Sequence, residues 1–256
     1  MSSNRGKFVW HELMTTDAEA AEAFYTHVVG WQATDAGMPD MRYTLLSAGS
    51  VQVAGLMQMT DSAAAAGGRP GWSGFVSVED VDASAKQAAA AGATISHPPT
   101  DIPGVGRFAS LKDPQGAAFL LFRSQSEDPP MPAAGTPGLI GWNELYAESM
   151  ESDFKFYAGL FGWTKAEALD MGADGVYQMF AAGGQTIGGM MDRGSYIPSP
   201  TWLYYFNVSD ISAASERVTT MAGQILSGPT QVPGGSWIVQ CLDPQEAMFA
   251  LVGPKA

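Results

Sequence analysis

Two glutamates lie in apolar, strand-like segments that recur along the chain. Glu12 lies in FVWHELMT, and Glu144 lies in LIGWNELYAE, 132 positions later. Side chains alternate between the two faces of a strand, so Glu12 shares a face with Trp10, and Glu144 shares one with Trp142. A carboxyl group desolvated among aromatic rings has a raised pKa, which suits acid–base catalysis. The same pattern equally fits an ion-paired or hydrogen-bonded acid that fixes the sheet.

A helix is expected after each of these two segments. Thr16 or Asp17 can cap the first helix, and Gly30 can end it in the left-handed conformation. The helix sequence DAEAAEAFYTHVVGW returns as ESMESDFKFYAGLFGW, with Phe24 and Phe156 again 132 positions apart. Three strands are predicted after the first helix, from Trp31 onward and in RYTLLSAG and SVQVAGLMQM. The expected unit is therefore a β-α-β-β-β module.

A second module follows a flexible break predicted at residues 62–71. It comprises a strand at 74–80, a helix at 81–93, a strand within 94–101 and a hairpin across residues 113–116. The same pattern recurs 130 positions later, where Asp243 corresponds to Asp113. We therefore predict an α+β protein of four paired modules in tandem. The expected domains are residues 7–123 and 139–253, joined by a proline-rich linker at 124–138.

Composition excludes several classes of function. The 256 residues carry a net charge of −13, which argues against binding to nucleic acid, because phosphate backbones attract clustered lysine and arginine. No apolar run is long enough to cross a membrane and no signal segment opens the chain, so we expect a cytoplasmic protein without a membrane partner. The single cysteine agrees with a reducing compartment. A charged fraction of only 15% suggests extensive buried surface and is compatible with a homodimer.

The segments FYTHVVGW and FYAGLFGW resemble the helix-to-strand signature of the vicinal oxygen chelate superfamily, which includes glyoxalases, bleomycin resistance proteins and extradiol dioxygenases. The segments LKDPQGAAFLLF and CLDPQEAMFALV resemble the last two strands of that family's module. The resemblance covers nearly the whole chain as two tandem domains. It implies sheets that curl around cavities, in which active relatives hold a divalent metal on His, Glu or Gln side chains.

Carrying the family's metal-ligand positions onto this chain gives six residues. None of them is a good ligand for a divalent metal, which prefers imidazole, thiolate or carboxylate. We therefore predict no cofactor, and a divalent metal only at a displaced site. The six positions are Trp10, Ser73, Leu120, Trp142, Leu203 and Ala250.

The leading hypothesis is a protein that binds a small apolar or aromatic molecule in a sheet-lined cavity. One alternative is a lyase, isomerase or oxygenase-like enzyme that uses Glu12 or Glu144 as its catalytic base, or a displaced metal site. Another is a non-catalytic oligomeric assembly protein. The residues predicted to contact a ligand are aromatic or polar residues on the cavity-facing strands: Trp10, Tyr43, Ser73, Phe75, Phe122, Trp142, Tyr177 and Tyr205.

Overall fold

The computed structural model describes residues 4–38, 41–65, 67–126, 132–195 and 197–255. Its elements repeat the order strand, helix and three strands four times, with one short extra helix and one 3-10 turn. The first half contains β1 (Phe8–Thr15), α1 (Ala18–Val28), β2 (Gln32–Asp35), β3 (Tyr43–Ala48), β4 (Val51–Gln58), α2 (Asp61–Ala65), β5 (Gly71–Ser77), α3 (Val81–Ala90), β6 (Thr94–Ile102), β7 (Gly106–Lys112) and β8 (Ala118–Ser124). The second half contains β9 (Ile140–Ala147), α4 (Met150–Phe161), β10 (Thr164–Asp170), η1 (Gly172–Asp174), β11 (Val176–Ala182), β12 (Gln185–Asp192), β13 (Thr201–Asn207), α5 (Ile211–Thr220), β14 (Gln224–Gln231), β15 (Trp237–Leu242) and β16 (Met248–Gly253).

The first helix forms as its sequence predicts. The Asp17 side chain accepts a hydrogen bond from the Ala20 N–H at 3.0 Å and so satisfies a donor that the helix start leaves unpaired. Gly30 follows the helix with φ at +86°, a conformation that costs glycine little. The buried face of α1 recurs every three or four residues, which fits a helix packed along one side. That face consists of Ala18, Ala21, Phe24, Tyr25 and Val28.

The strands form two mixed sheets of eight, which confirms the predicted α+β fold. The order is β2-β3-β4-β1-β5-β8-β7-β6 in one sheet and β10-β11-β12-β9-β13-β16-β15-β14 in the other. The first strand of a module pairs in parallel with its last strand, which places Glu12 beside Gly55 and Glu144 beside Gly189. The remaining pairs within a module are antiparallel, as expected for strands joined by hairpins.

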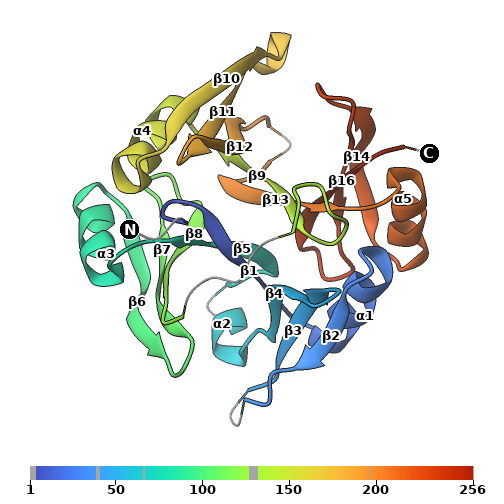
Figure 1. Cartoon of the computed structure of the whole chain (residues 1–256), viewed down its shortest axis with the longest axis horizontal. Helices are drawn as coiled ribbons and strands as arrows, with labels where there is room; N and C mark the ends of the chain where they lie inside the picture. Colours follow the sequence, from blue (N-terminus) through green and yellow to red (C-terminus); the bar gives the residue numbers. More distant parts are fainter. Residues whose placement is uncertain (1–3, 39–40, 66, 127–131, 196, 256) are drawn as a thin grey trace. The chain divides into compact units, whose positions relative to one another are not determined.

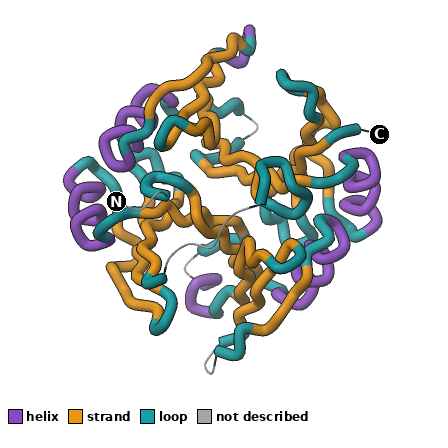
Figure 2. The backbone as a smooth tube through the Cα atoms, viewed as in Figure 1, coloured by secondary structure: helices purple, strands orange, loops and turns teal. Residues whose placement is uncertain are grey.

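The modules group into two compact units, each of which combines modules from both halves of the chain (Figure 1). Unit 1 takes in Met1–Trp10, Ser73–Pro130 and Trp142–Trp202, and unit 2 takes in His11–Trp72, Met131–Gly141 and Leu203–Ala256. The helices α3 and α4 lie side by side in unit 1, and α1 and α5 do so in unit 2. Figure 2 shows more strand than helix along the chain, with the helices lying beside the strands.

Each unit has an aromatic core tied to an Asp-Pro turn. In unit 2, the Tyr25 hydroxyl donates a hydrogen bond to Asp243 at 3.0 Å, and the Trp72 indole N–H donates to the Tyr25 oxygen at 2.9 Å. Asp243 also accepts the N–H of Gln245 and of Ala247, both at 2.9 Å, and so holds the turn between β15 and β16. Unit 1 repeats this arrangement at Asp113, Tyr157 and Trp202.

Two sequence expectations outside the modules have different outcomes. The break predicted at residues 62–71 is partly wrong, because α2 occupies Asp61–Ala65, where a run of alanines favours a helical turn. The strand sought within residues 94–101 is confirmed as β6. Residues 127–131 of the proposed linker lie outside the described residues. No helix in the described part of the chain has the length and hydropathy needed to cross a lipid bilayer.

Candidate functional site

Glu144 in unit 1 belongs to a chain of three hydrogen-bonded side chains. The Tyr177 hydroxyl on β11 donates to Glu144 Oε2 at 2.9 Å, and the Trp142 indole N–H donates to the Tyr177 oxygen at 2.6 Å. Glu144 is only 6% exposed. Burial, followed by the charge of Glu144, raises the pKa of Tyr177 well above its ordinary value. Tyr177 therefore keeps its proton and acts as a fixed donor to the carboxylate.

Unit 2 contains the equivalent pair on its first module. The Tyr43 hydroxyl on β3 donates to Glu12 Oε2 at 2.8 Å. Burial raises the pKa of the Glu12 carboxyl, and the hydrogen bond from Tyr43 opposes that rise only in part. A carboxyl group with a raised pKa can hold a proton closer to neutral pH than an ordinary glutamate. This pair is thus able to exchange a proton as well as to accept a hydrogen bond.

A glycine beside each glutamate makes room for the tyrosine. A methyl carbon at Gly55 would lie 1.9 Å from the Tyr43 oxygen, and one at Gly189 would lie 2.3 Å from the Tyr177 ring. Any larger residue at these positions would displace the ring. The sequence already carried a signal for this role, because VAGLM and IGGMM recur in equivalent modules, yet it did not reveal which side chain covers the glycine.

The remaining predicted ligand residues fall into separate groups. Phe75 and Phe122 in unit 1 pack edge to face with their ring centroids 6.0 Å apart. Trp10 on β1 and Ser73 on β5 are half-buried. In unit 2, the buried Tyr205 accepts a hydrogen bond from the Gln240 amide at 3.1 Å. The structure therefore joins each predicted glutamate to a predicted tyrosine, with Trp142 bonded to the pair of unit 1, and places Phe75 with Phe122 and Tyr205 with Gln240 in separate contacts.

Phe108 and His97 extend the aromatic cluster of unit 1 and were not among the predicted ligand residues. The Phe75 and Phe108 ring centroids lie 6.4 Å apart, and the His97 imidazole stacks on Phe108 at 5.1 Å with an interplanar angle of 6°. His97 Nε2 also lies 3.0 Å from the Thr100 hydroxyl. No sequence motif indicated this stacking, because it depends on the register between β6 and β7.

The donor groups near the two glutamates do not fit the divalent metal of the family. Each glutamate is paired with a phenol, whereas a divalent ion needs several imidazole, thiolate or carboxylate ligands. Within the described residues, no three His, Cys, Asp or Glu side chains are grouped so that they could hold a metal ion. We therefore derive no catalytic step through a metal at these positions.

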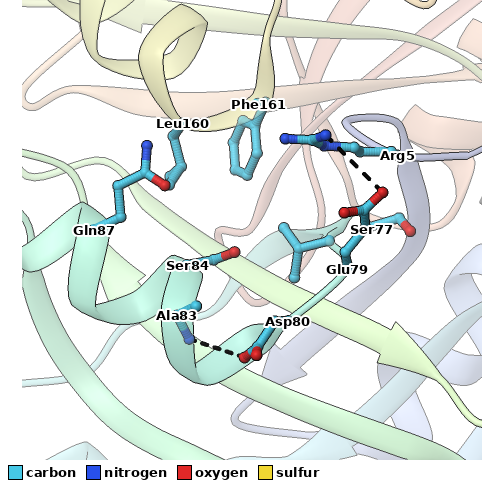
Figure 3. Close-up of a pocket in the computed structure, with 10 residues that line it drawn as sticks. Arg5, Ser77, Glu79, Asp80, Ala83, Ser84, Gln87, Leu160 and Phe161 are labelled. Carbon is cyan, nitrogen blue, oxygen red and sulfur yellow. Dashed lines mark hydrogen bonds and ion pairs between the residues drawn. The ribbon is translucent and has the colours of Figure 1, made fainter. Parts of the chain in front are cut away.

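Two pockets in unit 1 lie beside α3 and α4, and none of the predicted site residues lines them. One, of about 160 Å³, has Arg5, Glu79 and Gln87 in its wall (Figure 3). There Arg5 pairs with Glu79 at 4.0 Å, and Asp80 caps α3 by accepting the Ala83 N–H at 2.9 Å. The other, of about 360 Å³, is a mostly apolar groove between the two helices. The polar contacts at the first pocket thus serve the local structure.

Comparisons with known proteins agree with this architecture. The model of the Glyoxalase/Bleomycin resistance protein/Dioxygenase superfamily matches residues 7–121 and 139–251. The chain is 30% identical over 247 residues to "Putative glyoxylase CFP32" of Mycobacterium tuberculosis, covering 96% of this chain and 94% of that protein. It is 29% identical over 260 residues to "Anthracycline biosynthesis protein DnrV" of Streptomyces peucetius, covering 96% of this chain and 93% of that protein.

Several solved structures also have a fold similar to that of this chain. A Mn(II)-bound glyoxalase from Novosphingobium aromaticivorans has a TM-score of 0.68 at 15% identity, covering 98% of this chain and 83% of that one. Homoprotocatechuate 2,3-dioxygenase from Brevibacterium fuscum has a TM-score of 0.69 at 13% identity, covering 100% of this chain and 82% of that one. At these identities, the likeness indicates a shared fold only. Any chemistry has to be inferred from this chain's own residues.

Proposed function

The chain belongs to the Glyoxalase/Bleomycin resistance protein/Dioxygenase superfamily, and from that premise we propose that it binds a small, planar aromatic molecule without a metal. The observation that carries this proposal is the hydrogen-bonded Glu–Tyr pair on the first module of each half of the chain. These pairs lie two residues from the positions where the family resemblance implies metal ligands. A carboxylate and a phenol can hold a hydroxyl or carbonyl group of a ligand.

The aromatic residues near each pair set the class of ligand. Planar aromatic ligands gain area burial and edge or face contacts from side chains such as Trp142 and Tyr177. Two relatives at 29% identity are named for the biosynthesis of anthracyclines, which are fused-ring aromatic compounds bearing hydroxyl and carbonyl groups. Such a compound offers both of the features that the Glu–Tyr pairs and their aromatic neighbours would recognise.

Titration with a hydroxyanthraquinone, followed by tryptophan fluorescence and calorimetry, tests this function. We expect saturable binding, weakened about 2- to 10-fold in Tyr177→Phe and in Tyr43→Phe, because each substitution removes one hydrogen bond to a partly buried carboxylate. Tyr204→Phe, a buried tyrosine on β13, is the control for losing a phenol oxygen elsewhere. Binding that is absent from the wild-type protein across a panel of planar aromatic compounds would refute the proposal.

A second candidate function is proton transfer by Glu12 during turnover of the bound molecule. The raised pKa of this carboxyl favours it, since a general acid or base works best when its pKa approaches the working pH. Glu12→Gln keeps the shape but cannot titrate, so it should lower any turnover about 100- to 10,000-fold while leaving ligand affinity within a few-fold. Turnover unchanged in Glu12→Gln would exclude Glu12 as the group that transfers the proton.

A further inference from the structure

Asp153 is a buried carboxyl group without a hydrogen-bond partner among the described residues. It lies in the first turn of α4, is 1% exposed, and neither of its carboxyl oxygens accepts a hydrogen bond from any of those residues. The equivalent helix of the first half carries Ala21 at the position 132 residues earlier. The fold therefore accepts an apolar residue at this position, and the acid is a feature of unit 1 alone.

Asp113 is the acid whose charge acts on Asp153, and both of its carboxyl oxygens accept hydrogen bonds. Asp113 Oδ1 accepts the N–H groups of Gln115, Gly116 and Ala117 at 2.9, 2.7 and 2.9 Å. Its other oxygen accepts the Tyr157 hydroxyl at 2.9 Å. Burial raises the pKa of Asp113, and these four hydrogen bonds, which stabilise its anionic form, oppose that rise. A negative charge on Asp113 disfavours a second charge on Asp153.

The turn that carries Asp113 is also bonded to the start of α4. The Gln115 side chain donates to the Ser149 carbonyl at 3.0 Å and accepts the Ser149 N–H at 2.6 Å. On the other side, Asp192 of β12 accepts the Met150 N–H at 2.6 Å. These bonds join the start of α4, which carries Asp153, to the turn at residues 113–116 and to β12.

Within the described residues, no lysine or arginine side chain forms an ion pair with Asp153. Helix α3, which packs beside α4, presents the neutral amide of Gln87 to the Gly159 carbonyl at 3.0 Å. The titratable group one turn along α4 is Tyr157, whose pKa burial raises well above its ordinary value, so it stays neutral. Ion pairs among the described residues do not include Asp153. An ionised Asp153 would thus be desolvated and would face a like charge.

We propose that Asp153 is a pH-sensitive switch in unit 1: its neutral form allows the start of α4 to close against the turn at residues 113–116, and its ionisation releases both segments. Burial, followed by the charge of Asp113, raises the pKa of Asp153 to about 8. The first turn of a helix favours a negative charge, but that effect is small beside the cost of desolvation. The switch therefore operates on the alkaline side of neutrality.

The sign of the pH dependence follows from the direction of the pKa shift. The folded protein holds the proton more tightly than the unfolded chain, so the stability contributed by this proton is complete at acid pH. It falls as the pH rises toward about 8 and changes no further above that value. Carboxyl groups other than Asp113 contribute to the wild-type protein and to an Asp153 variant alike. The difference in unfolding free energy between the two proteins therefore reports the titration of Asp153 together with its interaction with Asp113.

The test is urea unfolding of the full chain from pH 5 to pH 9, in the wild type, Asp153→Ala and Asp153→Asn. We expect the unfolding constant of the wild type, relative to either variant, to rise by up to tenfold per pH unit between pH 5 and about pH 8 and then to level off. After division by the intrinsic exchange rate at each pH, hydrogen exchange should accelerate over the same range at residues 113–117 and 149–157 in the wild type only. An unfolding-constant ratio that does not change with pH, or corrected exchange that rises as much in the variants as in the wild type, would overturn the proposal.

Discussion

Replacing Asp243 with alanine should destabilise unit 2 by about 3–5 kcal/mol, since it removes the acceptor of several buried donors at once. The carboxylate is 3% exposed and accepts the N–H groups of Gln245 and Ala247 together with the Tyr25 hydroxyl. Alanine leaves these donors without a partner, and each unsatisfied buried donor costs about 1–3 kcal/mol. The turn between β15 and β16 should open, and the aromatic core beneath it should loosen.

Urea denaturation followed by near-ultraviolet circular dichroism measures this loss. Asp243→Asn is the matched control, because its amide oxygen can still accept the turn N–H groups and its amide nitrogen can donate to the Tyr25 oxygen. We expect the asparagine variant to lose only about 1 kcal/mol. Equal losses in both variants would mean that the carboxylate charge, and not the hydrogen bonds, stabilises this turn.

Replacing Gly189 with alanine should dismantle the Glu–Tyr pair of unit 1. The added methyl carbon would lie 2.3 Å from the Tyr177 ring, far inside contact distance, so the ring must leave its place. Glu144 then loses the Tyr177 donor, and the Trp142 N–H loses its acceptor. Overpacking costs about 1–3 kcal/mol, and each buried polar group left unpaired adds about 1–3 kcal/mol. We also expect aromatic ligand binding at this unit to fall by at least about tenfold.

Thermal unfolding and ligand titration of Gly189→Ala test these two effects. Gly159→Ala is the matched control, because a methyl carbon there would meet nothing within 4 Å and the residue lies in α4. Alanine exceeds glycine in helix propensity by about 1 kcal/mol, so this control should be neutral or slightly stabilising. The double variant Gly189→Ala with Tyr177→Ala should recover part of the stability but none of the binding. Full binding by Gly189→Ala would disprove the role of the Glu–Tyr pair.

The local elements of this protein could be predicted from its sequence. Asp17 caps a helix, Gly30 follows it with a positive φ, and the repeat spacing marks the same module four times. The cap and the glycine depend on residues within a few positions of one another, where backbone sterics and local hydrogen bonds decide the conformation. The repeat is visible by comparing the sequence with itself. Alternation along β1 also placed Glu12 and Trp10 on one face of that strand, as a period of two requires.

Only the tertiary structure decided which distant residues meet. Tyr43 bonds to Glu12 because β3 and β1 both flank β4, and the glycine between them leaves space for the ring. Four modules of similar pattern can also pair in more than one way. Bonds such as that from Tyr25 to Asp243, 218 positions away, show that modules from opposite halves share a core. Tertiary packing likewise decided that Asp153 is buried without a hydrogen-bond partner among the described residues.

The sequence therefore predicted one part of each Glu–Tyr pair, and the structure supplied the other. The sequence by itself determined the modules and the strands that carry Glu12 and Glu144. The tertiary structure decided that each glutamate meets a tyrosine and that the units join modules across the two halves. The physical reason is that strand periodicity determines the face a side chain occupies, whereas its partner depends on packing between segments far apart in the chain.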